Sequence, residues 1–404
     1  MKSLAWNRND AITALRQDIW RYVTQASTRE EDLLLWAGTL LQMPSSEVRY
    51  LAQLQFILSD PVANLVKQMP SLTRRLTTTT VSDVENSTER VRGAIRWSDT
   101  FTQRAATGVP NLFVTAPSHR AHNTAENQVL AFALFAIADF GKRTGWHRGS
   151  LEGPAAQIRS RVAEATRWRQ TRQLVDLPTR VPTAKTISRV RNGRARLRYD
   201  AAVEVIDLYQ RYIARLDREA IRNAIENDAL VTSRDSVLLE LHCAFNTIKA
   251  LQRLGWQSPA TGLIRPPLIF SAERGDAELQ LIYQSAPSGL ASGSLYRGTQ
   301  AAHNFSVSSS LIPDLVIKTT CGNATRWLLI EVKGGVKRSV VDSARAATLD
   351  LLGYRRAFAP VLDNQAELYG LGYAWGRGLA PSTDGDVTLC TPDTLPDALA
   401  ALIG

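Results

Sequence analysis

The sequence lacks several features that would assign it directly to a common class of protein. It contains no run of about 18 apolar residues, the length that crosses a bilayer as a helix. Its first residues, MKSLAWNRNDAITALRQ, carry charges before the apolar core of a signal peptide could form. We therefore expect a soluble, cytoplasmic protein with no membrane partner.

Cysteine and histidine are also scarce. The three cysteines, Cys243, Cys321 and Cys390, are far apart, and the five histidines are scattered. This distribution argues against a disulfide framework, a CxxC zinc site and an HNH-type cluster. The sequence has no GxxxxGK[ST] loop either, so the chain is not itself a P-loop motor.

Positive charge is what the chain has in excess. Its 48 Lys and Arg against 38 Asp and Glu give a formal net charge of +10. Such a surface attracts polyanions, because basic side chains displace counterions from phosphate. Charge alone leaves three alternatives open: a nucleic acid partner, a membrane surface and a solvated basic face.

The densest basic run lies between Leu177 and Tyr199, where no acidic residue occurs. One interpretation is a solvated face. The other is a strip that contacts phosphates, since guanidinium groups suit phosphate oxygens and Tyr199 could stack on a base. The basic residues of this run are Arg180, Lys185, Arg189, Arg191, Arg194, Arg196 and Arg198.

The length of 404 residues predicts two or three compact units. We expect a helical N-terminal domain over 1–85, a mixed, Arg-rich region over 86–230 that engages DNA or a partner, and a third domain over 231–404. Three amphipathic helices are predicted within the first sixty residues, followed by a strand-like alternation of Val91, Ile95 and Trp97. A strand at LFVTA, a helix from Asn123 or Thr124 towards Gly145, and two helical pieces around an Arg-rich connector complete this half.

The third domain has a distinct order of predicted elements. An apolar helix closed by Gly255 comes first, and three strands, a helix and a further strand follow. This α-β-β-β-α-β order describes a compact mixed-sheet α/β domain. In sequence letters the elements are RDSVLLELHCAFNTIKALQRLGW, ELQLIYQ, PDLVIKTT, RWLLIEVKG, SVVDSARAATLDLLGYRRAF and AELYGLGYAWG, with the hairpin loop at CGNAT.

Two carboxylates and a lysine stand at matching ends of two of these strands. Asp314 begins one strand and Glu331 ends the next, so a hairpin would bring both to one edge of the sheet. Lys333 lies two residues beyond Glu331, on the same face. Carboxylates that converge in this way can hold magnesium for phosphodiester cleavage, with the lysine on the attacking water or the phosphate. The alternatives are an internal Glu–Lys ion pair and a strand end that simply reaches water.

These residues carry a resemblance. PDLVIK followed by LLIEVKGG resembles the PD-(D/E)xK motif of the restriction-endonuclease-like nuclease superfamily, and the predicted order of elements is similar to its core. The resemblance implies a C-terminal restriction-endonuclease-like core behind a mainly helical N-terminal half. It also implies a metal-linked role for Glu240 in the preceding helix. Asp350 and Tyr354 resemble a Q-x-x-x-Y element, with Asp in place of Gln.

A narrower resemblance is to the nuclease subunits of McrBC-type restriction systems and their bacterial relatives. NTAENQVLAFAL and LLELHCAFNTIKALQRLGW are similar to their Asn-Thr-Pro-Glu-Asn helix start and their glutamate-bearing helix, with Ala125 in place of the proline. This resemblance implies an NTP-driven motor, or another defence-system subunit, as a partner.

Taken together, these residues predict a metal-dependent DNA endonuclease of a bacterial restriction or phage-defence system, in which a metal-activated water hydrolyses the phosphodiester bond. The expected catalytic residues are Asp314, Glu331, Lys333 and Glu240, of which the three acidic ones hold Mg²⁺ or Mn²⁺. The residues expected to contact DNA are Arg189, Arg191, Arg194, Arg196, Arg198, Lys337 and Arg338. The alternative is a non-catalytic DNA-binding or assembly subunit that keeps the nuclease fold.

Overall fold

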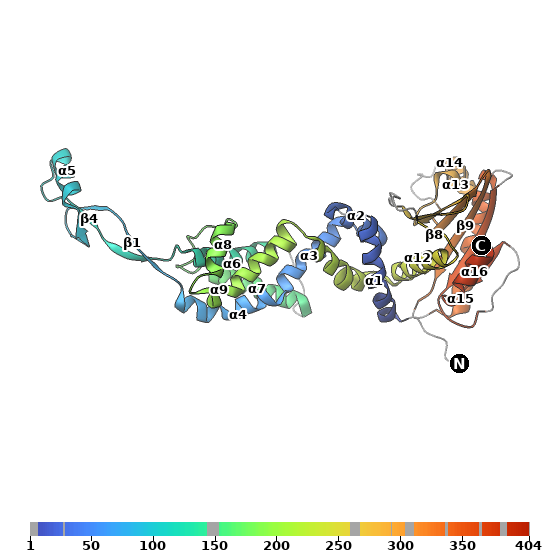
Figure 1. The fold of residues 1–404 in the computed structure, drawn as a ribbon, viewed down its shortest axis with the longest axis horizontal. Coiled ribbons are helices and arrows are strands. Elements are labelled where there is room, and N and C mark those ends of the chain that lie inside the picture. The colour runs from blue at the N-terminus through green and yellow to red at the C-terminus, as the bar shows by residue number, and fades with distance from the viewer. Residues whose placement is uncertain are drawn as a thin grey trace. The chain divides into compact units, whose positions relative to one another are not determined.

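A computed structural model describes most of the chain (Figure 1). The chain divides into two compact units, which we call the sheet unit (1–52 and 217–404) and the middle unit (53–216). This division differs from the three expected segments, because the first helices belong with the C-terminal part of the chain rather than forming a domain of their own. The described residues are 7–26, 29–143, 153–258, 267–291, 293–303, 311–335, 338–362, 366–379 and 386–403.

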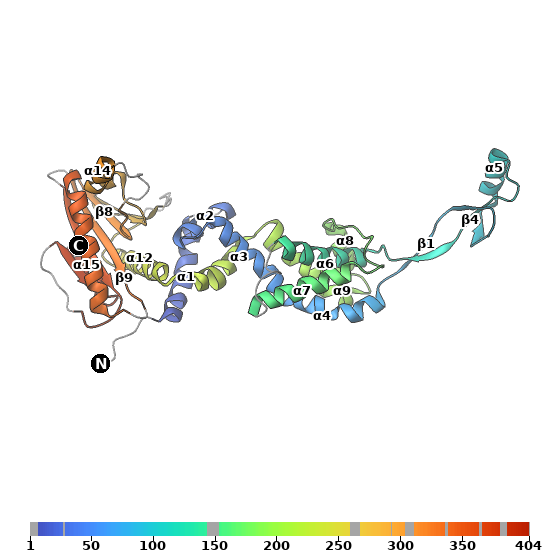
Figure 2. The ribbon, with the colours of Figure 1, turned by 180° about the vertical axis from the view of Figure 1, so that it is seen from behind.

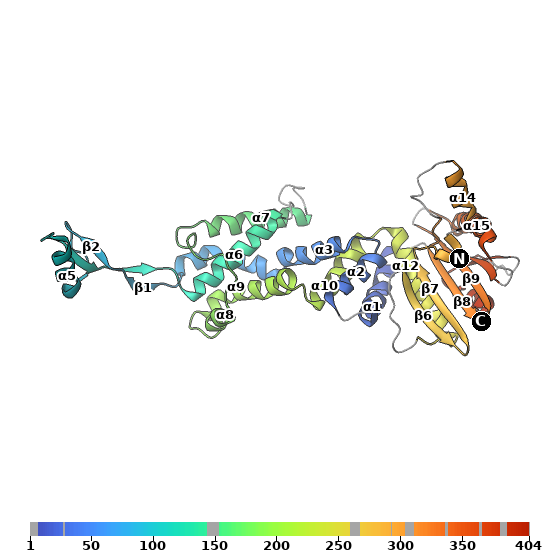
Figure 3. The ribbon, with the colours of Figure 1, turned by 90° about the horizontal axis from the view of Figure 1, so that it is seen from above.

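The sheet unit is built on a six-stranded mixed sheet with the order β11-β10-β9-β8-β7-β6. Strands β6 to β9 run antiparallel to their neighbours and lie side by side in Figure 3, whereas β9, β10 and β11 are parallel. The mixed α/β class and the four predicted strands are thereby confirmed; the sequence prediction missed β6 and β11. The strands are β6 Leu268–Arg274, β7 Ala277–Tyr283, β8 Leu315–Cys321, β9 Ala324–Lys333, β10 Ala366–Ala374 and β11 Val387–Cys390.

Helices α12 (Asp235–Arg253) and α15 (Val340–Phe358), which were both predicted, pack on the sheet, and α16 (Leu395–Ile403), which was not predicted, packs against β10 and β11. Helix α12 contacts β9, and α15 contacts β9 and β10 (Figure 2). Alternate side chains of β9 face α15: Trp327 and Leu329 share a core cluster with Leu351 of that helix. Because side chains alternate along a strand, Glu331 and Lys333 lie on this same face.

Close packing of α15 requires two glycines in β10. A Cβ atom added to Gly372 would lie 3.1 Å from Ala347 Cβ and 2.6 Å from Leu389 Cδ2. One added to Gly370 would lie 3.4 Å from Leu351. The GLG sequence of β10 therefore lets α15, and the charged residues it carries, come close to the sheet.

The first helices of the chain complete the sheet unit. Asp18 of α1 accepts from Lys249 of α12 at 2.6 Å, and Arg16 donates to the Glu226 carbonyl at 2.9 Å. These contacts explain why residues 1–52 belong with the C-terminal part. The remaining helices of the unit are α1 Arg8–Ala26, α2 Glu30–Leu40, the start of α3 Ser45–Leu58, α10 Arg218–Ala224, the π-helix Ile225–Ala229, α11 Leu230–Thr232, α13 Ser288–Ala291, α14 Leu295–Ala302 and the 3₁₀ turn Ala359–Val361.

The middle unit is mainly helical. Strands β1 and β5 form a two-stranded ribbon that connects these helices to a small sheet of order β2-β4-β3 and to α5. Its elements are α4 Asp60–Leu72, the 3₁₀ turn Thr73–Arg75, β1 Thr79–Ser82, β2 Glu85–Ser87, β3 Ala94–Ile95, α5 Trp97–Thr107, β4 Phe113–Ala116, β5 Ser118–Ala121, α6 Ala125–Arg143, α7 Gly153–Arg169, α8 Ala184–Arg191, α9 Arg196–Tyr209 and the π-helix Gln210–Ala214.

The structure of this unit differs from the sequence prediction in two places. The strand expected through Val91, Ile95 and Trp97 is only the two-residue β3, and Trp97 starts a helix in which it stacks on Phe101 at 5.9 Å. Val91 and Trp97 are exposed, so their alternation did not mark a buried sheet face. The Arg-rich connector contains a further helix, α8, that was not predicted; Thr183 caps its N-terminus by accepting from the Thr186 amide.

The predicted helix start at Thr124 is confirmed, and it belongs to a buried polar network. Thr124 Oγ1 accepts from the Asn127 amide, and Asn127 Nδ2 donates to the Thr77 and His122 carbonyls at 2.8 Å each. Asn127 is fully buried, so these bonds satisfy its amide and fix where β1 and β5 meet α6. Gly145 lies outside the described residues.

No helix within the described ranges combines the length and the apolar character that a membrane crossing requires.

Candidate functional site

Asp314 and Glu331 meet at one end of the β8–β9 hairpin, as the sequence predicts. The register pairs Leu315 with Ile330, which places Asp314 opposite Glu331 at the next position. Asp314 Oδ2 accepts from the Val332 amide at 2.8 Å, so this carboxylate is anchored to the end of the neighbouring strand.

Glu331 is the more deeply buried carboxylate, with 3% of its surface exposed. Its Oε1 accepts from Lys333 Nζ at 2.5 Å. Its Oε2 is buried and accepts no hydrogen bond from any residue that the structure describes. Since buried polar atoms normally have partners, this oxygen is one that a bound cation would satisfy.

Lys333 forms a second ion pair, with Asp350 Oδ2 of α15 at 2.9 Å. Asp350 thus reaches the cluster, although it stands where the resembled element has Gln. Burial on its own would lower the pKa of Lys333, but the hydrogen bond and charge of Glu331 outweigh it and raise that pKa. The amine therefore stays protonated. Tyr354, one turn later, donates to the Ile312 carbonyl at 3.2 Å.

Both carboxyl groups are less acidic than exposed ones. Burial, followed by the charge of Glu240, raises the pKa of Asp314 to about 7, against the lowering effect of the Val332 amide. Burial, followed by the charge of Asp314, raises the pKa of Glu331 to about 7, against the lowering effect of Lys333. The site thus holds negative charges together in a poorly solvated place, which favours a cation between them.

Glu240 of α12 joins this cluster through Gln284, a residue that sequence reasoning did not single out. Gln284 Nε2 donates to Glu240 Oε2 at 2.9 Å and to Asp314 Oδ1 at 3.0 Å. Glu240 Oε2 also accepts from Gln42 Nε2 at 2.6 Å and from the Tyr283 hydroxyl at 3.2 Å. The available signal was position, since Gln284 ends a predicted strand at the edge where Asp314 begins the next.

His242, two residues after Glu240, does not join the cluster. Its Nδ1 lies 3.2 Å from the Tyr373 hydroxyl, and its ring packs edge-on against Trp375. Burial, followed by the charge of Lys249, lowers its pKa to about 4, so the ring is neutral at physiological pH. Its role is structural, as its helical position two residues from Glu240 predicts.

The residues present fit a divalent cation of the oxygen-preferring type. Magnesium is commonly held by one or two carboxylates, with water and substrate phosphate completing its shell. Asp314 and Glu331 supply such a pair, and the unpartnered Glu331 Oε2 supplies an unused ligand atom. Over the described ranges, no three His, Cys, Asp or Glu side chains are arranged to hold one ion.

The predicted DNA-contacting arginines lie in the middle unit. Arg189 and Arg191 are in α8, Arg194 precedes α9, and Arg196 and Arg198 are in its first turn; all five are exposed. Arg191 is paired with Asp207, and Arg198 donates to the Arg75 carbonyl. Arg189, Arg194 and Arg196 form no ion pair with any residue that the structure describes. Arg338 is exposed, and Lys337 lies outside the described residues.

The base-stacking role suggested for Tyr199 is wrong. Tyr199 is fully buried in α9, and its hydroxyl donates to Asn127 Oδ1 at 2.8 Å. Helical spacing places it on the same buried side as Val203 and Ile206, so its ring belongs to the core.

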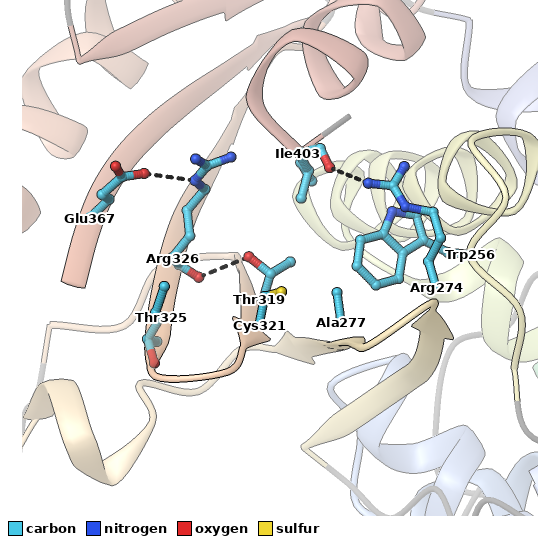
Figure 4. Close-up of a pocket in the computed structure, with 10 residues that line it drawn as sticks. Trp256, Arg274, Ala277, Thr319, Cys321, Thr325, Arg326, Glu367 and Ile403 are labelled. Carbon is cyan, nitrogen blue, oxygen red and sulfur yellow. Dashed lines mark hydrogen bonds and ion pairs between the residues drawn. The ribbon is translucent and has the colours of Figure 1, made fainter. Parts of the chain in front are cut away.

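A separate pocket of about 300 Å³ lies at the other end of the β8–β9 hairpin (Figure 4). Arg274 there donates to the carbonyls of Leu254 at 3.2 Å and Ile403 at 3.4 Å, and Arg326 donates to that of Leu402 at 3.0 Å. These carbonyls close α12 and α16, where cationic side chains are stabilising. Capping of two helices thus accounts for both arginines.

Comparison with known proteins assigns this chain to no family. The sequence matches no protein-family model and no curated protein. Among solved structures, a half-complex from a tetradecameric assembly of Thermococcus gammatolerans McrB AAA+ hexamers with bound McrC aligns over 98% of this chain and 94% of that chain, at 10% identity and a TM-score of 0.25. A likeness at this level establishes neither a shared fold nor a function.

The raised pKa values predict how stability depends on pH. Between about pH 4 and pH 7 the folded chain keeps protons that the unfolded chain has released, so these two groups make the free energy of unfolding fall as pH rises. Glu331→Gln removes one charge. The free energy of unfolding of this variant, taken relative to that of the wild type, should be higher at pH 8 than at pH 4 by on the order of 1 to 3 kcal/mol.

Urea unfolding in EDTA across this pH range provides the measurement. Asp276→Asn, in the exposed turn between β6 and β7, is the control and should track the wild type. Parallel curves for Glu331→Gln and wild type would contradict the electrostatic account of the site.

Proposed function

We propose that this chain is a metal-dependent DNA nuclease whose active site consists of Asp314, Glu331 and Lys333. The observation that supports this most is their convergence: two carboxylates from different strands meet at one end of a hairpin, and Lys333 Nζ lies 2.5 Å from Glu331. The unpartnered, buried Glu331 Oε2 adds to this support.

We further propose that the sheet with α12 and α15 corresponds to a restriction-endonuclease-like core. The support is the order of elements together with the positions of Asp314 and Glu331 on adjacent antiparallel strands. A role in restriction or phage defence, with an NTP-driven partner, stays a prediction from the sequence resemblance.

Each residue has a distinct part in the proposed reaction. Asp314 and Glu331 would hold the divalent cation, with Glu240 as a further carboxylate beside Asp314. A bound cation would supply positive charge against the phosphoryl oxygens and favour ionisation of the attacking water. Lys333, which is protonated, would exchange its bonds with Glu331 and Asp350 for the attacking water or a phosphate oxygen.

One observation favours the alternative, a non-catalytic subunit that keeps the fold. Lys333 already has two acidic partners, Glu331 and Asp350, which is also what an internal ion pair would require. In that case the cluster would stabilise the hairpin without performing chemistry.

Cleavage of plasmid DNA distinguishes the two functions. In Mg²⁺ or Mn²⁺, and not in EDTA, the wild type should nick supercoiled plasmid. Lys333→Met should lower the rate by about 100-fold or more, the usual effect of losing one electrostatic contact to the reacting groups. Asp314→Asn should be similarly impaired.

The control is Lys318→Met, on the adjacent strand, whose amine lies 5.4 Å from the Trp327 ring centre. It should cleave as the wild type does. Equal cleavage by Lys333→Met and wild type would refute the assignment, and no cleavage by wild type in either metal would favour the non-catalytic subunit.

DNA as the substrate is proposed from the charge of the chain and from the exposed arginines of α8 and α9. A triple variant in which Arg189, Arg194 and Arg196 are all replaced by Ala should bind DNA more weakly, whatever the base sequence of the DNA. It should also reduce the slope of log affinity against log salt by about 0.9 for each phosphate contact that is lost.

Fluorescence anisotropy with a labelled duplex, at several salt concentrations, measures both quantities. The matched control replaces Arg49, Arg172 and Arg253, which are exposed but spread over the chain. If the two triple variants lose equal affinity, α8 and α9 form no specific DNA-contacting surface.

A further inference from the structure

Backbone strain in the described residues is concentrated next to the carboxylate cluster. Among the described residues other than glycine, three have a positive φ: Gln42 at 52°, Leu216 at 50° and Gln284 at 48°. Glutamine is not among the residues that adopt this region readily, and the conformation costs roughly 1 to 2 kcal/mol. Two of the three strained residues donate to the same carboxylate, Glu240.

The strain at Gln42 occurs at a position where glycine would be expected. Gln42 directly follows Leu41, the C-cap of α2, and its amide donates to the Thr39 carbonyl at 3.2 Å. Helices commonly end with glycine in this left-handed position. Position 42 instead carries glutamine, although a positive φ is unfavourable for a residue with a Cβ atom. The side chain of Gln42 contacts Glu240.

The amide of Gln42 is also held in one orientation. Its Oε1 accepts from Arg234 Nη2 at 3.2 Å, so its Nε2 must face Glu240 and the Tyr283 hydroxyl, at 2.6 and 3.0 Å. A carboxamide nitrogen can only donate. Gln42 therefore presents N–H groups to Glu240 and no competing lone pair.

Gln284 is anchored from both its backbone and its side chain. Its backbone amide donates to the Asp314 carbonyl at 2.9 Å, and its side-chain amide bridges Glu240 and Asp314. The two N–H groups of one nitrogen thus hold two carboxylates that would otherwise repel each other. In this way Glu240 is kept beside Asp314.

We propose that Gln42 and Gln284 are positioning residues that hold Glu240 beside Asp314, next to the pair of carboxylates, Asp314 and Glu331, that would hold the cation. Through Gln42, the end of α2 contributes to this arrangement. The inference rests on the proposed function and extends it, because it assigns a role to residues outside the motif.

The test separates the side-chain amide from the backbone strain. Gln42→Gly and Gln42→Ala both lack the amide, but only glycine relieves the strain. If Gln42 positions Glu240, both variants should lose Mn²⁺ affinity equally, by about 10-fold, the usual effect of losing a residue that orients a metal ligand. Because glycine relieves the strain, Gln42→Gly should have a higher melting temperature than Gln42→Ala. Gln284→Gly and Gln284→Ala should behave in the same way.

A double variant checks that Gln42 acts through Glu240. Glu240→Gln should itself weaken Mn²⁺ binding, and adding Gln42→Gly should then weaken it no further, because the two residues act as one unit. Mn²⁺ binding to the full chain is followed by electron paramagnetic resonance.

Two outcomes would overturn the inference while the proposed function stands: affinity restored in the glycine variants, or affinity that follows melting temperature across the set. Additive losses in the double variant would likewise overturn it. Failure of the proposed function looks different, because the wild type itself would then bind no Mn²⁺, and the inference would fall with it.

Discussion

The like charges of Asp314 and Glu331 repel each other at the buried end of the β8–β9 hairpin, and the neighbouring polar groups offset this repulsion. Lys333 lies against Glu331, the Val332 amide donates to Asp314, and Gln284 connects Asp314 to Glu240. Burial still raises the pKa of both carboxyl groups to about 7. The protein thus keeps two carboxyl groups close together in a buried place, which is unfavourable without a cation. Strongly shifted pKa values of this kind are typical of binding sites and not of exposed surface charges.

The scaffold serves this arrangement from three directions. The register of β8 and β9 fixes the two carboxylates, α15 brings Asp350 to Lys333, and α12 brings Glu240. The glycines of β10 allow α15 to approach, and the end of α2 adds Gln42. Helices from the two ends of the sequence therefore converge on one sheet edge, which accounts for the grouping of residues 1–52 with the C-terminal part.

The hairpin and its charged residues could be predicted because a strand's period and a short turn determine which side chains converge. Gln42 could not be predicted, since its contact with Glu240 spans most of the chain and its positive φ leaves no mark in the sequence. Strand β6 was missed although Gly275 and Asp276 form a turn signal before β7. The base-stacking role predicted for Tyr199 was wrong because the arginines around it drew attention to charge, whereas the helical spacing of Tyr199, Val203 and Ile206 places its ring in the core.

Direct titration of Mn²⁺ into the metal-free chain, compared with Glu331→Gln, tests the central claim most directly. The account predicts a Mn²⁺ site in the wild type that is lost when the carboxylate with the unpartnered oxygen becomes an amide. Both proteins should have the same circular dichroism spectrum. Equal Mn²⁺ binding by the two proteins, or none by either, would contradict the assignment of Asp314 and Glu331 as a cation site.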